Sequence, residues 1–220
     1  AGCPQGKYGY AAGQTTEAAG CTNCSSGTYG ESARLASAFD CTACDAGTYS
    51  PVFGATSAST CQLCPLGTAL SFAGGSSLSD CSACQVGEYG DTEGASSCKS
   101  CPAGTYGNST VGVGAVSEAQ ACIPCAAGKY GSSEGASTES SCQVCPTGSY
   151  SGTAGLSSEG ACTSCPAGKY GVAAGQTTEA AGCASCPAGK WSSATRASLA
   201  STCTNCPAGS YSATEGLASA

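Results

Sequence analysis

Pairs of cysteines separated by two residues recur along the whole chain at a nearly constant interval. The pairs are Cys21/Cys24, Cys41/Cys44, Cys61/Cys64, Cys81/Cys84, Cys98/Cys101, Cys122/Cys125, Cys142/Cys145, Cys162/Cys165, Cys183/Cys186 and Cys203/Cys206. Cys3 stands where the second member of an eleventh pair would be. Counted between second cysteines, eight of the ten steps are 20 or 21 residues long. A fixed period of this kind predicts a linear array of similar units rather than a globule.

The composition leaves disulfides as the main source of stability. Cysteine accounts for 21 of 220 residues, whereas only 19 residues are Ile, Leu, Val or Phe. A chain so poor in large apolar side chains cannot offset its conformational entropy with a conventional core. We therefore predict small disulfide-rich repeats in an elongated rod of about eleven units, with turns, short β segments and little helix.

The expected domain organisation is one continuous array over residues 1–220. Its units start near Cys3, Cys21, Cys41, Cys61, Cys81, Cys98, Cys122, Cys142, Cys162, Cys183 and Cys203, and we expect the array to be cut in mid-repeat at both ends. Residues 7–21 recur almost unchanged as residues 169–183, which indicates a duplicated block of eight units. Units joined end to end are favoured over a compact solenoid, because long strand runs are absent.

A glycine and an aromatic residue hold fixed places in each unit. Glycine follows every second cysteine by three residues, and proline follows seven of these cysteines directly. Cys-Pro-x-Gly is predicted to form a type I turn with proline second and glycine fourth. Two residues after the glycine comes Tyr or Trp in every unit but one, where Ala69 stands and Phe72 is a possible substitute. One ring per unit, lying against the disulfides, is the expected small core.

The cysteine spacing favours bridges between successive pairs. The second cysteine of one pair would bond the first cysteine of the next, as Cys3–Cys21, Cys24–Cys41, Cys44–Cys61, Cys64–Cys81, Cys84–Cys98, Cys101–Cys122, Cys125–Cys142, Cys145–Cys162, Cys165–Cys183 and Cys186–Cys203. Cys206 would stay unpaired within this sequence. Bridges inside each pair are typical of redox-active sites. They remain the alternative, since sequence alone does not fix connectivity.

Several classes of function are disfavoured. The chain has no histidine, a net charge of −7 and no cluster of Lys or Arg, so neither a Ser-His or Cys-His catalytic pair nor nucleic-acid binding is expected. No run of 18 apolar residues is present, so this segment is not expected to insert into a membrane. Zinc sites of four cysteines share the local spacing, but the regular period favours disulfides. We predict no enzyme activity, no cofactor and no metal.

Two sites fit the pattern for N-glycosylation. Asn108-Ser-Thr lies in the one long insert, and Asn23-Cys-Ser lies inside a cysteine pair where access is restricted. Asn108 is the favoured site and Asn23 a possible one. Disulfides and glycans both belong to the secretory pathway, so we expect an extracellular, secreted or cell-surface protein.

The motif Cys-x-x-Cys-Pro-x-Gly-x-Tyr-Gly, as in residues 162–171, resembles the ephrin-receptor-like cysteine-rich repeat. It is also similar to tumour-necrosis-factor-receptor modules and to some EGF-like repeats. The resemblance implies an elongated, disulfide-linked and non-catalytic array. Arrays of this kind occur in surface proteins of protists and algae, including antigens and the hairs of flagella, called mastigonemes.

The favoured function is an extracellular structural protein that forms a fibre or surface coat, with a flagellar hair as its most concrete form. Its expected partners are further copies of itself, in a homo-oligomer or filament, together with glycans. Lateral contacts are expected from faces rich in Ala and Gly and from exposed apolar residues such as Val111, Val113 and Val116. The alternative is a cell-surface stalk, antigen or receptor ectodomain that does not polymerise.

Overall fold

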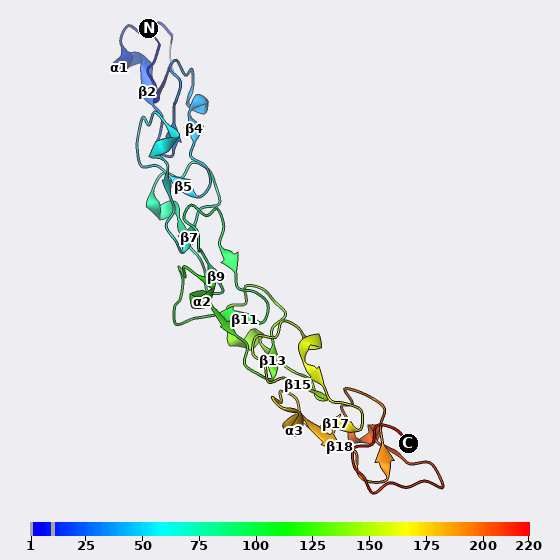
Figure 1. The fold of residues 1–220 in the computed structure, drawn as a ribbon. Coiled ribbons are helices and arrows are strands. Elements are labelled where there is room, and N and C mark those ends of the chain that lie inside the picture. The colour runs from blue at the N-terminus through cyan, green and yellow to red at the C-terminus, as the bar shows by residue number, and fades with distance from the viewer. Residues whose placement is uncertain (1, 10–11) are drawn as a thin grey trace. The chain divides into compact units, whose positions relative to one another are not determined.

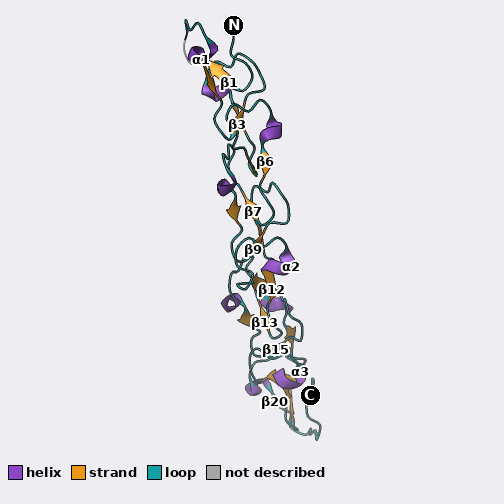
Figure 2. Cartoon of the chain, turned by 90° about the vertical axis from the view of Figure 1, so that its left-hand side faces the viewer, coloured by secondary structure: helices purple, strands orange, loops and turns teal. Residues whose placement is uncertain are grey.

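The structure is a computed structural model that describes residues 2–9 and 12–220. Contacts divide the chain into two parts, which are described separately. The first part comprises Ala1–Lys99 with Thr110–Ala121, and the second comprises Ser100–Ser109 with Cys122–Ala220. In both parts the secondary structure consists of two- and three-residue strands, single helical turns and connecting loops, as Figure 2 shows. The predicted repeats of turns and short β segments with little helix are confirmed.

Each repeat that is closed by a disulfide contains one short antiparallel hairpin. In the first part these are β1 (Lys7–Gly9) with β2 (Cys21–Asn23), β3 (Thr28–Tyr29) with β4 (Thr42–Ala43), β5 (Thr48–Tyr49) with β6 (Gln62–Leu63), and β7 (Thr68–Ala69) with β8 (Ser82–Ala83). β9 (Glu88–Tyr89) follows, and β10 is Lys99–Ser100. Figure 1 shows β2, β4, β5, β7 and β9 succeeding one another in chain order.

The second part repeats the same arrangement. Its hairpins are β11 (Thr105–Gly107) with β12 (Cys122–Pro124), β13 (Lys129–Tyr130) with β14 (Gln143–Val144), β15 (Ser149–Tyr150) with β16 (Thr163–Ser164), β17 (Lys169–Gly171) with β18 (Cys183–Ser185), and β19 (Lys190–Trp191) with β20 (Thr204–Asn205). In each hairpin the first strand contains the position at which the ring recurs from repeat to repeat. The second strand begins at or beside the first cysteine of a pair.

A helical turn precedes the second strand in most repeats. The α-helical turns are α1 (Glu17–Gly20), α2 (Glu118–Ala121) and α3 (Glu179–Gly182). The 3-10 turns are η1 (Ala38–Asp40), η2 (Ala58–Thr60), η3 (Leu78–Asp80), η4 (Glu139–Ser141), η5 (Glu159–Ala161) and η6 (Ala200–Thr202). Thr16 caps α1 by accepting a hydrogen bond from Ala19 N, because a threonine hydroxyl satisfies a free N–H of the first turn.

The turn after each second cysteine differs in register from the prediction. The N–H of Lys169 donates to the carbonyl of Pro166 at 3.2 Å, and the equivalent bond occurs in the other repeats. Proline is therefore the first residue of the turn, and Gly168 is the third, with φ of 83°. Positive φ at the third residue is the requirement of a type II turn. The predicted type I turn, with proline second and glycine fourth, is wrong.

A second position needs the left-handed conformation, and the sequence analysis missed it. It lies ten residues after the second cysteine in all repeats except the one with the insert. Its members are Gly13, Arg34, Gly54, Gly74, Gly94, Gly114, Gly135, Gly155, Gly175, Arg196 and Gly216, all with positive φ. Nine glycines at one place in the period were a readable signal, because glycine adopts positive φ without a Cβ penalty. We call this the left-handed position.

Candidate functional site: the interlocked disulfide ladder

Each disulfide joins the second cysteine of one pair to the first cysteine of the next pair, and so closes one repeat. The bonded pairs are Cys3–Cys21, Cys24–Cys41, Cys44–Cys61, Cys64–Cys81, Cys84–Cys98, Cys101–Cys122, Cys125–Cys142, Cys145–Cys162, Cys165–Cys183 and Cys186–Cys203. Nine of the second cysteines, from Cys24 to Cys186, are almost fully buried. Cys206 is a free, half-buried thiol. The sulfurs thus occupy the place of an apolar core.

The aromatic rings pack near these bridges to differing degrees. Tyr130 is buried against Cys145 and Cys162, which form the next disulfide, with Leu156 beside them. Its hydroxyl donates to Oε1 of Gln143 across the hairpin at 2.8 Å. The repeat without a ring is different from what was expected. Phe72 does not replace the ring, because its side chain is 54% exposed, whereas Leu70 is buried.

Backbone hydrogen bonds connect each repeat with the next one. In the first part, Gly30 N donates to Ala55 O at 2.9 Å, and Gly54 N donates back to Cys24 O at 2.8 Å. The same two bonds recur in the second part, where Gly131 N donates to Leu156 O and Gly155 N to Cys125 O, both at 2.8 Å. Isolated parallel bridges such as Tyr29 with Ala55 accompany them. Neighbouring repeats are therefore linked by paired backbone rather than joined only through the chain.

The turn glycine, three residues after the second cysteine, also meets the repeat after next. A Cβ on Gly47 would collide with the carbonyl of Gly94, and one on Gly148 would lie 2.7 Å from the carbonyl oxygen of Arg196. Both partners occupy the left-handed position two repeats further on. Only glycine admits this approach of backbone to backbone. The glycine that marks each turn in the sequence thus has a second role, which is to let three consecutive repeats interlock.

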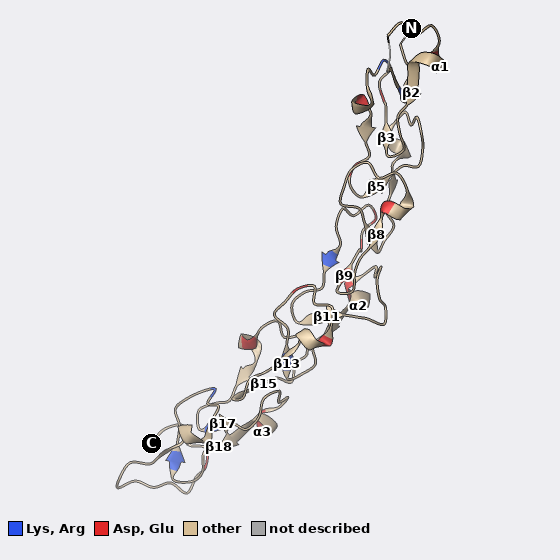
Figure 3. Cartoon of the chain, turned by 180° about the vertical axis from the view of Figure 1, so that it is seen from behind, with Lys and Arg blue, Asp and Glu red and all other residues tan. Residues whose placement is uncertain are grey.

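Charged side chains form weak surface pairs. Lys7 with Glu17, Lys129 with Glu139, and Lys169 with Glu179 are ion pairs of 2.6 to 2.8 Å, each ten residues apart. Figure 3 shows such charges placed singly along each part, without a basic cluster. Exposed pairs of this kind contribute little to stability, because water and salt screen them. Hydrogen bonding to Lys129 lowers the pKa of the Glu139 carboxyl from its ordinary value. These pairs tie the ring strand to the helical turn of their own repeat.

Among the described residues, no group of three or more His, Cys, Asp or Glu side chains is placed to hold a metal ion. A search of the same residues finds no helix with the length and apolar character needed to cross a membrane.

The two glycosylation candidates lie in unlike surroundings. Asn108 follows β11 in the insert, and the Ser109 and Thr110 that complete its motif are exposed. Asn23 ends β2, directly before the buried Cys24, and its side chain is placed against the next repeat, 3.2 Å from where a Cβ of Gly54 would be. The surroundings favour Asn108 as the site of modification. Val111, Val113 and Val116 lie in the same insert and are all exposed.

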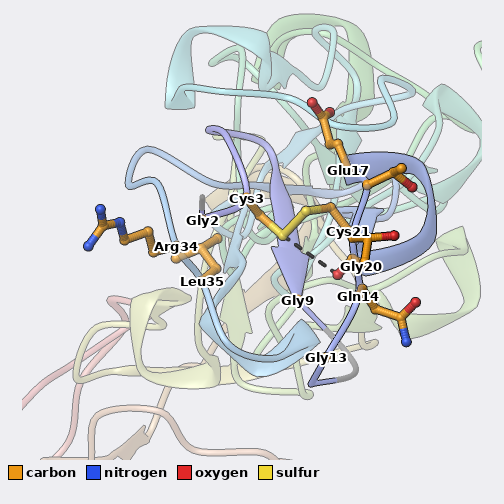
Figure 4. A pocket seen from close by; sticks show the side chains of 12 residues that line it. Gly2, Cys3, Gly9, Gly13, Gln14, Glu17, Gly20, Cys21, Arg34 and Leu35 are labelled. Atoms are coloured by element: carbon orange, nitrogen blue, oxygen red, sulfur yellow. Dashed lines mark hydrogen bonds between the residues drawn. A yellow bond between two sulfur atoms is a disulfide. The ribbon is translucent and has the colours of Figure 1, made fainter.

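A hollow lies on the first repeat, at the face by which later repeats contact the repeat before them. Figure 4 shows it between Gly9, Gly13, Gln14 and Arg34, beside the Cys3–Cys21 disulfide. Its volume is about 670 Å³. In later repeats the preceding repeat covers the residue equivalent to Gly9. In the second repeat this residue is Gly30, and a Cβ on it would lie 3.1 Å from Gly6 N of the first repeat. The hollow thus lies at the face that, in later repeats, is in contact with the preceding repeat.

Comparison with protein families gives one match. The family described as tyrosine-protein kinase ephrin type A/B receptor-like matches residues 30–81 and 71–120. Residues 30–120 are therefore similar to ephrin-receptor-like repeats. The ephrin-receptor-like repeat is a cysteine-rich module without catalytic function, and it indicates an extracellular or secretory-pathway location, in agreement with the disulfides. Comparison with curated proteins finds no match.

Proposed function

We propose that this protein is an extracellular structural protein whose repeats form a fibre or surface coat, and that a flagellar hair is the most concrete form. The observation that carries the proposal is the recurrence of the same backbone contacts from repeat to repeat. Gly27 N donates to Ser50 O, and Gly128 N donates to Ser151 O, both at 2.8 Å and both between residues 23 positions apart. An array stabilised by nearest-neighbour terms of this kind extends by simple repetition.

Partners in this proposal are further copies of the chain and glycans. The apolar residues of the insert, Val111, Val113 and Val116, are exposed and would supply lateral contacts. Asn108 in the same insert would carry a glycan. Enzymatic release of N-glycans in heavy-oxygen water tests the second point, because a modified Asn108 becomes a labelled aspartate that mass spectrometry identifies. Recovery of Asn108 as unlabelled asparagine from native material would show that this residue does not carry an N-glycan.

Negative-stain microscopy of the native protein tests the assembly. Filaments of constant diameter, decorated by antibodies against this chain, are expected if the chain polymerises. Isolated particles of a single size at every concentration would instead favour the second candidate, a surface stalk or receptor ectodomain that does not polymerise. The match to ephrin-receptor-like repeats supports that candidate, since the matched family is named for receptors. Immunolabelling of intact cells then shows whether the material lies on flagella.

A further inference from the structure

One hairpin of the first part lacks both of the large side chains that the preceding hairpin places opposite each other. In β5 and β6, Tyr49 lies opposite Gln62 and its hydroxyl donates to Oε1 of that residue at 3.0 Å. In β7 and β8, the same two places hold Ala69 opposite Ser82. The ring-bearing hairpins with this register are those of Tyr8, Tyr29, Tyr49, Tyr106, Tyr130, Tyr150, Tyr170 and Trp191. Ala69 is the exception in this series.

The missing ring leaves a hollow that the rest of the repeat does not fill. It has a volume of about 300 Å³ and is lined by Ala69 and Ser82, with Phe72 among the other lining residues. Phe72 stays 54% exposed, and Leu70, the one large apolar residue nearby that is buried, makes its close contact with Gly75. No side chain of this repeat therefore takes the place that Tyr49 fills in the preceding one.

The lining sets the chemistry of an occupant. Ala69, Leu70 and Phe72 provide apolar surface, while Ser82 and Gln85 provide a hydroxyl and an amide. Asp80 and Glu88 also line the hollow, and their carboxylates disfavour an anion. A volume near the lower end of the range for small-molecule sites suits a single ring rather than a larger ligand.

We propose that this hollow is a binding site for one uncharged phenol ring supplied by a small molecule. The other hairpins show what fits such a place, because each has a tyrosine or tryptophan at the position of Ala69, opposite a residue of the second strand. A phenol in the hollow covers Ala69 and Ser82 as the ring of Tyr49 covers its own hairpin, with its hydroxyl toward the polar rim. The site is specific to this repeat, since the other rings block the equivalent places.

Titration of the whole ¹⁵N-labelled chain with p-cresol, which has the structure of a tyrosine side chain, tests this site. Saturable amide shifts are expected at residues 69–72 and 82–85 and not at the equivalent residues of the Tyr49 hairpin. Ala69→Tyr fills the hollow and should weaken binding at least tenfold. Methyl glucopyranoside, a ring of similar size with hydroxyls all round, should give no saturable shifts.

A second variant creates the site elsewhere and does not depend on the folding of the first. Tyr49→Ala with Gln62→Ser reproduces the Ala69–Ser82 pair in the preceding repeat, and p-cresol should then shift residues 49–52 and 62–65 as well. The proposal is overturned if p-cresol gives no saturable shifts in the native chain, if Ala69→Tyr folds and binds it equally well, if the double variant folds without gaining a site, or if only the pyranoside binds.

Discussion

Leu70 and Gly75 share one space within a single repeat. A Cβ added to Gly75 would lie 2.5 Å from Cδ2 of Leu70 and 2.9 Å from the carbonyl oxygen of Thr48. Two repeats earlier the sizes are reversed, since Leu35 takes the place of Gly75 and a Cβ on Gly30 would lie 2.8 Å from Cδ1 of Leu35. The space between the position of Leu70 and the position of Gly75 therefore holds one large side chain, and that side chain can come from either position.

Gly75→Ala should destabilise its repeat by about 1–3 kcal/mol, because the added methyl overpacks a filled space. Hydrogen exchange of the Leu70 amide, which bonds Ala95 O at 3.1 Å, reports the local opening free energy. Combining Gly75→Ala with Leu70→Ala should cost less than the sum of the two single changes, because the second removes the clashing Cδ2. Strict additivity of the two would contradict a shared space.

Gly67→Ala and Gly209→Ala separate the two roles of the turn glycine. Both residues have positive φ, 77° and 86°, but Gly67 faces the carbonyl of Gly114 and a Cβ on Gly209 would meet nothing within 4 Å. Gly209→Ala should cost about 1–2 kcal/mol from backbone conformation alone. Gly67→Ala should cost about 1–3 kcal/mol more, from overpacking. Equal losses in hydrogen exchange stability would show that the interlock between repeats contributes nothing at this glycine.

Removal of one bridge tests the disulfide ladder. Cys44→Ala with Cys61→Ala opens a loop with a sequence separation of 17 and should destabilise its repeat by about 3 kcal/mol. Cys206→Ala is the control, because this thiol is free, and it should leave stability unchanged. Peptide mapping under non-reducing conditions should recover Cys21 joined to Cys3. A peptide in which Cys21 is joined to Cys24 would refute the connectivity.

Asp80 should make its repeat sensitive to acid. Its Oδ2 accepts hydrogen bonds from Ser76 N at 2.7 Å and Ser77 N at 3.1 Å, and these backbone bonds lower the pKa of the carboxyl below its ordinary value. A lowered pKa in the folded state means that the stabilisation is complete above the ordinary carboxyl pKa of about 3.9 and is lost as pH falls through the lower folded value.

Exchange rates of the Ser76 and Ser77 amides, followed from pH 6 to pH 2 and corrected for intrinsic rates, check this dependence. Protection should decrease on acidification in the native chain. In Asp80→Asn, which cannot ionise, protection should be lower at pH 6 and vary little across the range. An unchanged acid response in the variant would assign the effect to another group.

The period, the unit of about 20 residues and the reliance on cysteine in place of a core could all be predicted from the residues alone. These follow from local constraints, since the spacing of cysteines limits the loop each bridge closes, and scarce apolar residues exclude a globule. The cap of α1 is a local feature of the same kind, since the Thr16 hydroxyl accepts from Ala19 N three residues along the chain. The match of residues 30–120 to ephrin-receptor-like repeats agrees with the motif from which the resemblance was drawn.

The contacts between repeats could not be predicted in this way and are seen only in the folded chain. The turn is a type II turn beginning at proline, and the composition of Cys-Pro-x-Gly did not reveal which carbonyl accepts its hydrogen bond. Phe72 lines the space of the missing ring but does not fill it, because that space lies at the cross-strand pair of Ala69 and Ser82. At Gly47 a glycine is required because the carbonyl of Gly94, two repeats ahead, occupies the place of its Cβ. Such a contact joins residues far apart in sequence, so no local pattern specifies it.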